Sequence, residues 1–285
     1  MIEMIGIMKW PVIACLLLPG ILVYYGLHIV EREIIFVDLS LAQVAALGIC
    51  VCVMLGHEGR EVHTYLWSLG FTLVGALIFT LTRSSRNLHV PQEALIGIVY
   101  VVAAALGILL LSRSAEGNEE LRRTLVGDVL LVRPDQIART FAVYAGIGAV
   151  HYLFRRQFLM ISFAPARAAT EGLAVRWWDF LFYALLGVVV TSFVQIGGVL
   201  LVFSYLIVPA VCANLLADSL GARLVIGWLT ATVASVGGLA GSFKFDLPTG
   251  AAIVCALGAA LLLVSIAAWI RRRVHPPSQI DELPS

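Results

Sequence analysis

Asp38 is the residue whose type and setting most directly suggest chemistry. It lies in an apolar stretch, residues 34–55, and is followed by Ser40 and Gln43 in the segment VDLSLAQVAALG. A carboxylate inside an apolar membrane segment is energetically costly, so it is a candidate for binding a cation or a proton. Two plainer roles are open for Asp38: pairing with Arg32 near the membrane surface, or capping a local break in the chain.

A second carboxylate, Asp246, lies in the segment KFDLPTG between two apolar stretches. It could attract cations at the outer mouth of a pathway. The same residues are also typical of a turn, with Pro248 near the start of the next helix. The two roles are compatible.

Gly127 and Asp128 lie in the apolar run 125–132, within the charged connection 113–139. This run is too short to cross a bilayer, which takes about 20 residues. The segment 120–134 is therefore predicted either to lie at the membrane surface or to enter the membrane and return. In the second case Gly127 and Asp128 belong to a gate.

The basic segment 155–177 contains the signals of a short helix. Pro165 begins the run PARAAT and Gly172 lies just beyond it, which predicts a helix over Pro165–Thr170. Small side chains along this helix would let another protein surface approach closely. An ordinary surface helix is the alternative interpretation.

Membrane-spanning helices must position these residues. Apolar residues make up 60% of the 285 residues and charged residues 13%, against about 25% charged in a soluble domain. A spanning helix needs about 20 mostly apolar residues. The stretches that meet this requirement are 8–29, 34–55, 64–82, 93–112, 138–154, 178–196, 197–217, 223–242 and 248–270.

These stretches predict an all-α, multi-pass membrane protein with eight or nine transmembrane helices. Eight is the alternative because only Gln195, Gly197 and Gly198 separate the sixth stretch from the seventh. The spans and their short connections form one domain, residues 1–275, and residues 276–285 form a tail. All five cysteines fall in predicted spans, so neither a disulfide nor a thiol metal site is expected.

The arginines outside the spans predict the orientation. Four lie in segment 155–177, and Arg271, Arg272 and Arg273 begin the tail. Cytoplasmic loops collect basic residues, so both segments are placed in the cytoplasm. With nine spans the N-terminus then lies outside the bacterial inner membrane.

Several motifs recur along the chain in a recognisable order. EREIIFVD is followed by LAQ and by Gly48; PQEALIGIVYVV, TLVGDVLLV, GGVLLVFSYLIVPA and KFDLPTGAAIV come after it. Together these motifs resemble those of the permease subunits of ABC-type importers for zinc, manganese and iron. The resemblance implies that Asp38, Gln43 and Asp246 line the metal path and that Gly127 and Asp128 belong to its gate.

The resemblance extends to the basic segment, because FAPARAATEGLAV is similar to the family's cytoplasmic coupling helix, which contacts the ATPase. It implies that Pro165, Arg167, Glu171 and Gly172 contribute to this coupling. Ala164 replaces the aspartate that the family has in this segment.

The metal site departs from the family pattern. The family has an aspartate and a histidine four residues apart, about 40° apart on one helix face. Gln43 takes the place of the histidine but lies five residues from Asp38, about 140° around a regular helix. Both could face one ion only across a one-residue π-bulge. Glutamine is also a weak ligand, so manganese, iron or a ligand other than a naked ion are as open as zinc.

The function implied by the resemblance is that of a permease subunit, which is a transporter component and not an enzyme. It would form a homodimer in membrane lipid, carry a divalent metal ion as substrate, and work with a cytoplasmic ATPase that binds the ATP and an extracytoplasmic metal-binding protein. The chain has no phosphate-binding loop of its own, and no bound cofactor or nucleic acid is expected. The alternatives are a secondary transporter with Asp38 as its protonation site, or a membrane protein that assists assembly without transporting.

Overall fold

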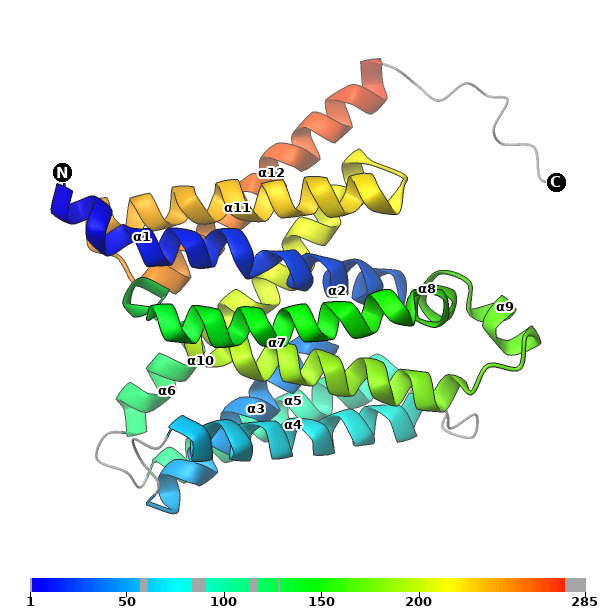
Figure 1. Ribbon diagram of the computed structural model, residues 1–285, viewed down its shortest axis with the longest axis horizontal. Helices are drawn as coiled ribbons and strands as arrows, with labels where there is room; N and C mark the ends of the chain where they lie inside the picture. The colour runs from blue at the N-terminus through cyan, green and yellow to red at the C-terminus, as the bar shows by residue number, and fades with distance from the viewer. Residues whose placement is uncertain (1, 57–60, 84–90, 113–116, 128, 275–285) are drawn as a thin grey trace.

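The computed structural model describes residues 2–56, 61–83, 91–112, 117–127 and 129–274 (Figure 1). These residues form helices and contain no strand. The elements are α1 (Ile2–Leu17), α2 (Pro19–Glu31), α3 (Val37–Met54), α4 (Glu61–Arg83), α5 (Gln92–Leu111), α6 (Gly117–Val126), η1 (Val129–Leu131), α7 (Pro134–Leu153), α8 (Arg155–Phe163), α9 (Pro165–Thr170), α10 (Val175–Leu216), α11 (Leu220–Phe245) and α12 (Thr249–Val274).

The number of spans depends on how two bent elements are counted. In the described residues, seven helices are long and apolar enough to cross a membrane, and α7 with α8, bent by 79°, can form an eighth span. α10 has 42 residues and breaks at Gly198, where φ is 72° and ψ is 170°. Its two halves run in different directions across the bundle (Figure 1), and counting them separately gives nine. The predicted all-α fold with eight or nine transmembrane helices is confirmed.

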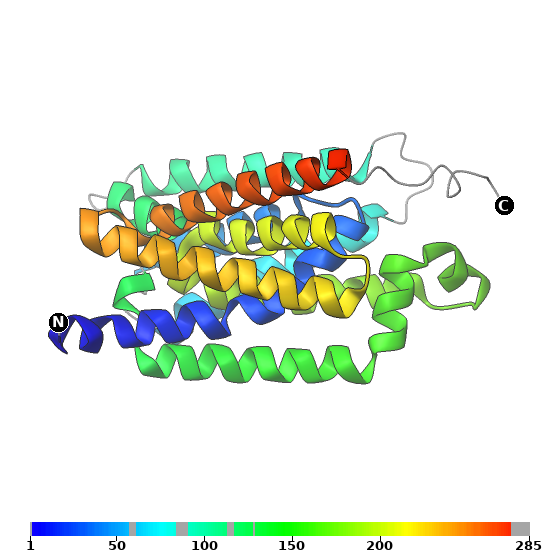
Figure 2. The ribbon, with the colours of Figure 1, turned by 90° about the horizontal axis from the view of Figure 1, so that it is seen from above.

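The bundle has two distinct ends (Figures 1 and 2). At one end lie α9, the end of α2 and the end of α12; this is called the α9 end. At the opposite end, called the far end, lie the N-terminus, α6 and the connection between α11 and α12. The N-terminus and α9 are therefore on opposite sides of the bundle, as an odd number of spans between them requires.

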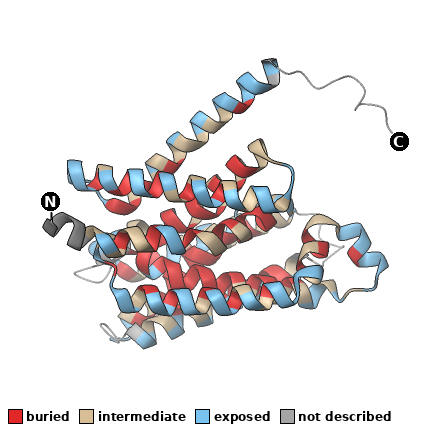
Figure 3. Cartoon of the chain, turned by 45° about the horizontal axis from the view of Figure 1, so that its top comes forward, coloured by how far each residue is buried: buried red, intermediate tan, exposed pale blue. Residues whose placement is uncertain are grey.

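α10 and α3 form the centre of the bundle. α10 packs against α2, α3, α4, α11 and α12 and buries Phe182, Tyr183, Phe193 and Tyr205. In the apolar part of α3, 78% of the residues are buried, whereas in that of α12 only 17% are buried. Figure 3 shows the same contrast, with buried residues in the middle of the bundle and α12 largely exposed. Asp38 thus lies on one of the innermost helices.

Small residues allow the central helices to approach each other closely. A Cβ on Gly26 of α2 would lie 1.8 Å from the carbonyl oxygen of Leu206, and one on Gly238 of α11 would lie 2.6 Å from the Cα of Ile253. In a membrane the helices gain little from hydrophobic burial against each other, so close packing at small residues holds them together.

Candidate functional site

α3 buries both of the residues that the sequence singled out on it. Asp38 is 0% exposed and Gln43 is also buried. α3 is a regular α-helix from Val37 to Met54, so the two side chains point about 140° apart. The predicted π-bulge is therefore wrong, and the structure does not bring Asp38 and Gln43 together at one point.

Asp38 is a buried carboxylate without a protein partner. Neither of its carboxylate oxygens, nor the Ser40 hydroxyl, has a hydrogen-bond partner among the described residues. Buried polar groups are nearly always paired, and an unpaired carboxylate is especially costly. Asp38 lies in the first turn of α3, where free backbone N–H groups favour negative charge. This setting suits a carboxylate that receives a cation or a proton.

α3 offers no second charged ligand on the face of Asp38. The residues three and four positions further along, Leu41 and Ala42, are apolar and buried. Within the part of the chain that the structure describes, no group of three His, Cys, Asp or Glu side chains could hold a metal ion.

Arg32 pairs with Asp179 and not with Asp38, so the first of the plainer roles for Asp38 is wrong. Arg32 Nη1 lies 3.1 Å from Asp179 Oδ1, and the two side chains are 1% and 4% exposed. The guanidinium also lies over the ring of Phe182, 3.9 Å from its centroid.

Two further polar residues complete this site, which is called the Arg32 cluster and consists of His28, Arg32, Ser162 and Asp179. Arg32 Nε donates to the Ser162 hydroxyl at 2.7 Å, and that hydroxyl lies 2.7 Å from His28 Nδ1. Sequence reasoning missed this cluster. The available signal was Asp179, a charged residue one position inside the predicted span 178–196.

The basic segment 155–177 has the helix that the sequence predicted. α9 covers Pro165–Thr170, and Gly172 follows it with φ 69°. Glu171 accepts hydrogen bonds from Arg167 Nε at 2.8 Å and from Arg156 Nη2 at 2.9 Å. The hydrogen bond from Arg167 is the main reason that the pKa of Glu171 is lowered. α9 is therefore a short exposed helix whose C-terminal end is held by the ion pairs of Glu171.

At the far end, α6 and the Gly127 that follows it pack against the break of α10. Gly127 has φ 64°, and a Cβ there would lie 2.2 Å from the carbonyl carbon of Gly197. A Cβ on Gly198 would lie 2.5 Å from the nitrogen of Gly127, and one on Gly250 would lie 2.0 Å from the carbonyl oxygen of Val126. Asp128, the second predicted gate residue, lies outside the described residues. We call the backbone contacts of Gly127, Gly198 and Gly250 the glycine contact.

Asp246 lies at the surface of the far end and not in the interior with Asp38. It is exposed, follows α11 and has φ 51°. The turn is closed by Ser242, whose carbonyl accepts from the Leu247 N–H at 3.0 Å and whose hydroxyl donates to the Leu247 carbonyl at 2.6 Å. The backbone here has the turn that KFDLPTG is typical of.

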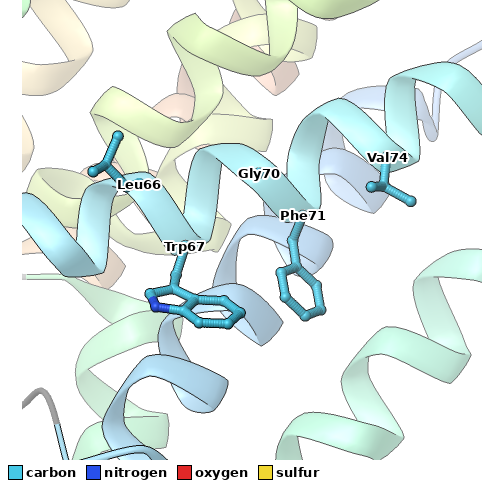
Figure 4. Close-up of a pocket in the computed structure, with 5 residues that line it drawn as sticks. All are labelled: Leu66, Trp67, Gly70, Phe71 and Val74. Atoms are coloured by element: carbon cyan, nitrogen blue, oxygen red, sulfur yellow. The ribbon is translucent and has the colours of Figure 1, made fainter.

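A groove on the surface of α4 is apolar. Leu66, Trp67, Gly70, Phe71 and Val74 line it (Figure 4). Its apolar walls suit hydrocarbon and offer nothing to a hydrated cation.

The comparisons with known proteins agree with this architecture. Residues 4–268 match the ABC 3 transport family. The chain belongs to that family. It is 30% identical over 230 residues, 80% of this chain and 79% of the relative, to the manganese transport system membrane protein MntC of Listeria monocytogenes. It is also 30% identical over 169 residues, 59% of this chain and 57% of the relative, to the chelated iron transport system membrane protein YfeD of Yersinia pestis.

A solved structure supports the same assignment. The chain matches PsaBC from Streptococcus pneumoniae in complex with Fab with a TM-score of 0.78 and 25% identity, over 92% of this chain and 93% of that one. The predicted importer permease fold is confirmed. The chain is a multi-pass permease of the bacterial inner membrane, and its relatives are membrane subunits of transport systems.

Proposed function

We propose that this chain is the membrane subunit of an ATP-driven importer of divalent metal ions, with manganese and iron ahead of zinc. The observation that carries the proposal is Asp38, a fully buried carboxylate without a protein partner on one of the innermost helices. Oxygen ligands suit manganese, whereas zinc favours the imidazole that this helix lacks. The names of the relatives, which include manganese and iron systems, support the same order.

The proposed complex contains two copies of the chain with the ion path between them, and a cytoplasmic ATPase beneath each copy. Pro165, Arg167, Glu171 and Gly172 are exposed together at the α9 end, where the ATPase would dock. An extracytoplasmic metal-binding protein would deliver the ion to the far end, near Asp246. ATP binds to the ATPase and not to this chain.

Transport then follows from the positions of these residues. The ion enters at the far end when Gly127, in the proposed gate, moves away from the break of α10. Asp38 supplies a negative charge inside the bundle, which lowers the cost of bringing a cation there. ATP-driven movement of α9 shifts the helices around Asp38, and the ion leaves on the cytoplasmic side.

A second candidate rests on the same unpartnered carboxylate. A secondary transporter would use Asp38 to bind a proton, because an intramembrane carboxylate without a counter-ion can be neutralised by protonation. That function predicts uptake that survives removal of the ATPase and collapses with the proton gradient.

The test is metal uptake by Asp38→Asn, in cells and in proteoliposomes that contain the ATPase. We expect loss of manganese and iron uptake while the complex still assembles, because the amide cannot supply the charge. Asp135→Asn, which removes an exposed carboxylate from the start of α7, is the matched control. Normal uptake by the Asp38 variant would remove this residue from the pathway, and uptake without the ATPase would favour the second candidate.

A further inference from the structure

We propose that the Arg32 cluster is a buried joint that makes the coupling segment move as one body with α2 and α10. Arg32 and Asp179 are then positioning residues, which link movement of α9 to movement of the helices around the ion path. The inference rests on the proposed function, since coupling has meaning only in an ATP-driven transporter.

The joint connects three elements that are distant in sequence. His28 and Arg32 come from α2, Ser162 from α8 and Asp179 from the first turns of α10. Arg32 donates through Nε to Ser162 at 2.7 Å and through Nη1 to Asp179 at 3.1 Å. One guanidinium therefore holds α8 and α10 to α2 at the same time.

The hydrogen-bond directions around Ser162 are consistent with each other. Its oxygen accepts from Arg32 Nε, which leaves its own hydrogen free to donate to His28 Nδ1 at 2.7 Å. Nδ1 accepts in the neutral tautomer that has its ring proton on Nε2, and Nε2 itself has no hydrogen-bond partner among the described residues. In that tautomer the hydrogen bonds run from Arg32 through Ser162 to His28.

Contacts of this kind resist sliding. Apolar helix surfaces inside a membrane gain little by staying in one register, whereas buried charged hydrogen bonds are directional and strong. If α10 shifted along α2, the Arg32 guanidinium and the Asp179 carboxylate would be left buried without compensation. If α8 shifted along α2, Arg32 Nε would lose its hydrogen bond to Ser162. The three elements are therefore expected to move together.

The joint lies beside the segment that would meet the ATPase. α8 is followed by α9 after Ala164 alone. Met160, Ile161 and Ala168 form an apolar cluster against which Trp178 of α10 packs. α8 is bent by 79° away from α7. Displacement of α9 would therefore move α8 and the start of α10. It would not act along the axis of α7, because α8 is bent away from that axis.

The joint is also linked to the candidate ion site by a short turn. Arg32 ends α2 as its C-cap, and Asp38 lies in the first turn of α3. The connection between them is closed by hydrogen bonds from Glu33 N to the Val30 carbonyl at 3.2 Å and from Val37 N to the Ile34 carbonyl at 3.1 Å. Displacement of Arg32 would therefore displace the start of α3.

The test compares ATP hydrolysis and manganese uptake in the same proteoliposomes, made from the full complex. For Asp179→Asn we expect an assembled complex that still hydrolyses ATP but takes up about tenfold less manganese per ATP, the size of an ordinary coupling between sites. Asp135→Asn, which removes an exposed carboxylate at the start of α7, should keep the wild-type ratio.

A second variant covers the case in which Asp179→Asn does not fold. The double variant Arg32→Met with Asp179→Leu replaces the pair by apolar side chains, which leaves no uncompensated charge. We expect this complex to assemble and to remain uncoupled, because the directional contacts are gone. A double variant with the wild-type ratio would overturn the joint while leaving the importer intact. A wild-type complex without ATP-dependent uptake would overturn the proposed function itself.

Discussion

Asp38 and Asp179 are both buried carboxylates, but their surroundings give them opposite effects on stability. Asp179 is paired with Arg32, whereas Asp38 has no hydrogen-bond partner in the described part of the chain. A residue that is costly to bury and yet unpaired is retained for a reason other than folding. Stability measurements can therefore separate the two roles without any transport assay.

Asp38→Leu is expected to stabilise the chain by about 1–3 kcal/mol, because it removes a buried group whose polar atoms are unsatisfied. Asp179→Asn is expected to destabilise it by about 3–5 kcal/mol, because Arg32 is left buried without its counter-charge. Thermal unfolding of the purified complex in detergent measures both. A lower unfolding temperature for Asp38→Leu would mean that Asp38 has a structural partner in the assembled complex.

At this scale the sequence predicted single residues better than it predicted pairs. Asp38 stands out because a charge is conspicuous in an apolar stretch. The pair of Arg32 and Asp179 joins residues 147 positions apart, and nothing in a linear pattern indicates which arginine meets which aspartate. For the same reason the sequence left open an Arg32–Asp38 pair that the structure does not contain.

At the scale of elements, the spans could be predicted because apolar length alone determines them. The predicted stretch 34–55 and the helix Val37–Met54 differ by a few residues. α8 was not predicted as a helix, because RRQFLMISF mixes polar and apolar residues without the length of a span. The π-bulge was wrong because it was inferred from a family spacing that this helix does not keep.

The glycine contact yields a prediction about α12. Gly250→Ala should destabilise the chain by about 1–3 kcal/mol, the usual cost of forcing an extra carbon into a packed site. A Cβ there would lie 2.0 Å from the Val126 carbonyl oxygen. Gly258→Ala on the same helix is the matched control, since a Cβ at Gly258 meets nothing within 4 Å. Thermal unfolding compares the two variants.

In the control variant, alanine should be neutral or slightly stabilising, because it favours a helix by up to about 1 kcal/mol over glycine. Equal effects at Gly250 and Gly258 would contradict the close approach of α6 and α12. The sequence could not have distinguished these two glycines, since both stand in the same apolar helix and only the third dimension separates them.

At the scale of the whole molecule, the structure places the turn at Asp246 and the helix α9 at opposite ends of the bundle (Figure 1). The positions of the arginines predict that α9 is cytoplasmic. Residue 246 should then be outside the cell membrane. This orientation can be tested without knowing the transported ion.

The test uses single cysteine substitutions in a chain whose native cysteines have been replaced. Asp246→Cys should react with a membrane-impermeant maleimide in intact spheroplasts, and Ala169→Cys on α9 should react only after the membrane is permeabilised. Both positions are exposed, so unequal labelling reports sidedness and not burial. Labelling of the α9 position in sealed spheroplasts would show that the chain has the opposite orientation in the membrane.

The break at Gly198 has a mechanical consequence for the whole chain. The first half of α10 runs from Asp179, in the joint, to Gly198, in the glycine contact, over a length of about 29 Å. A tilt of about 5° at the α9 end would displace the other end by about 2.5 Å. Contacts between bare backbones cannot stretch by that amount and stay closed. The glycine contact would therefore open abruptly once the tilt of α10 exceeds a threshold, and not in proportion to that tilt.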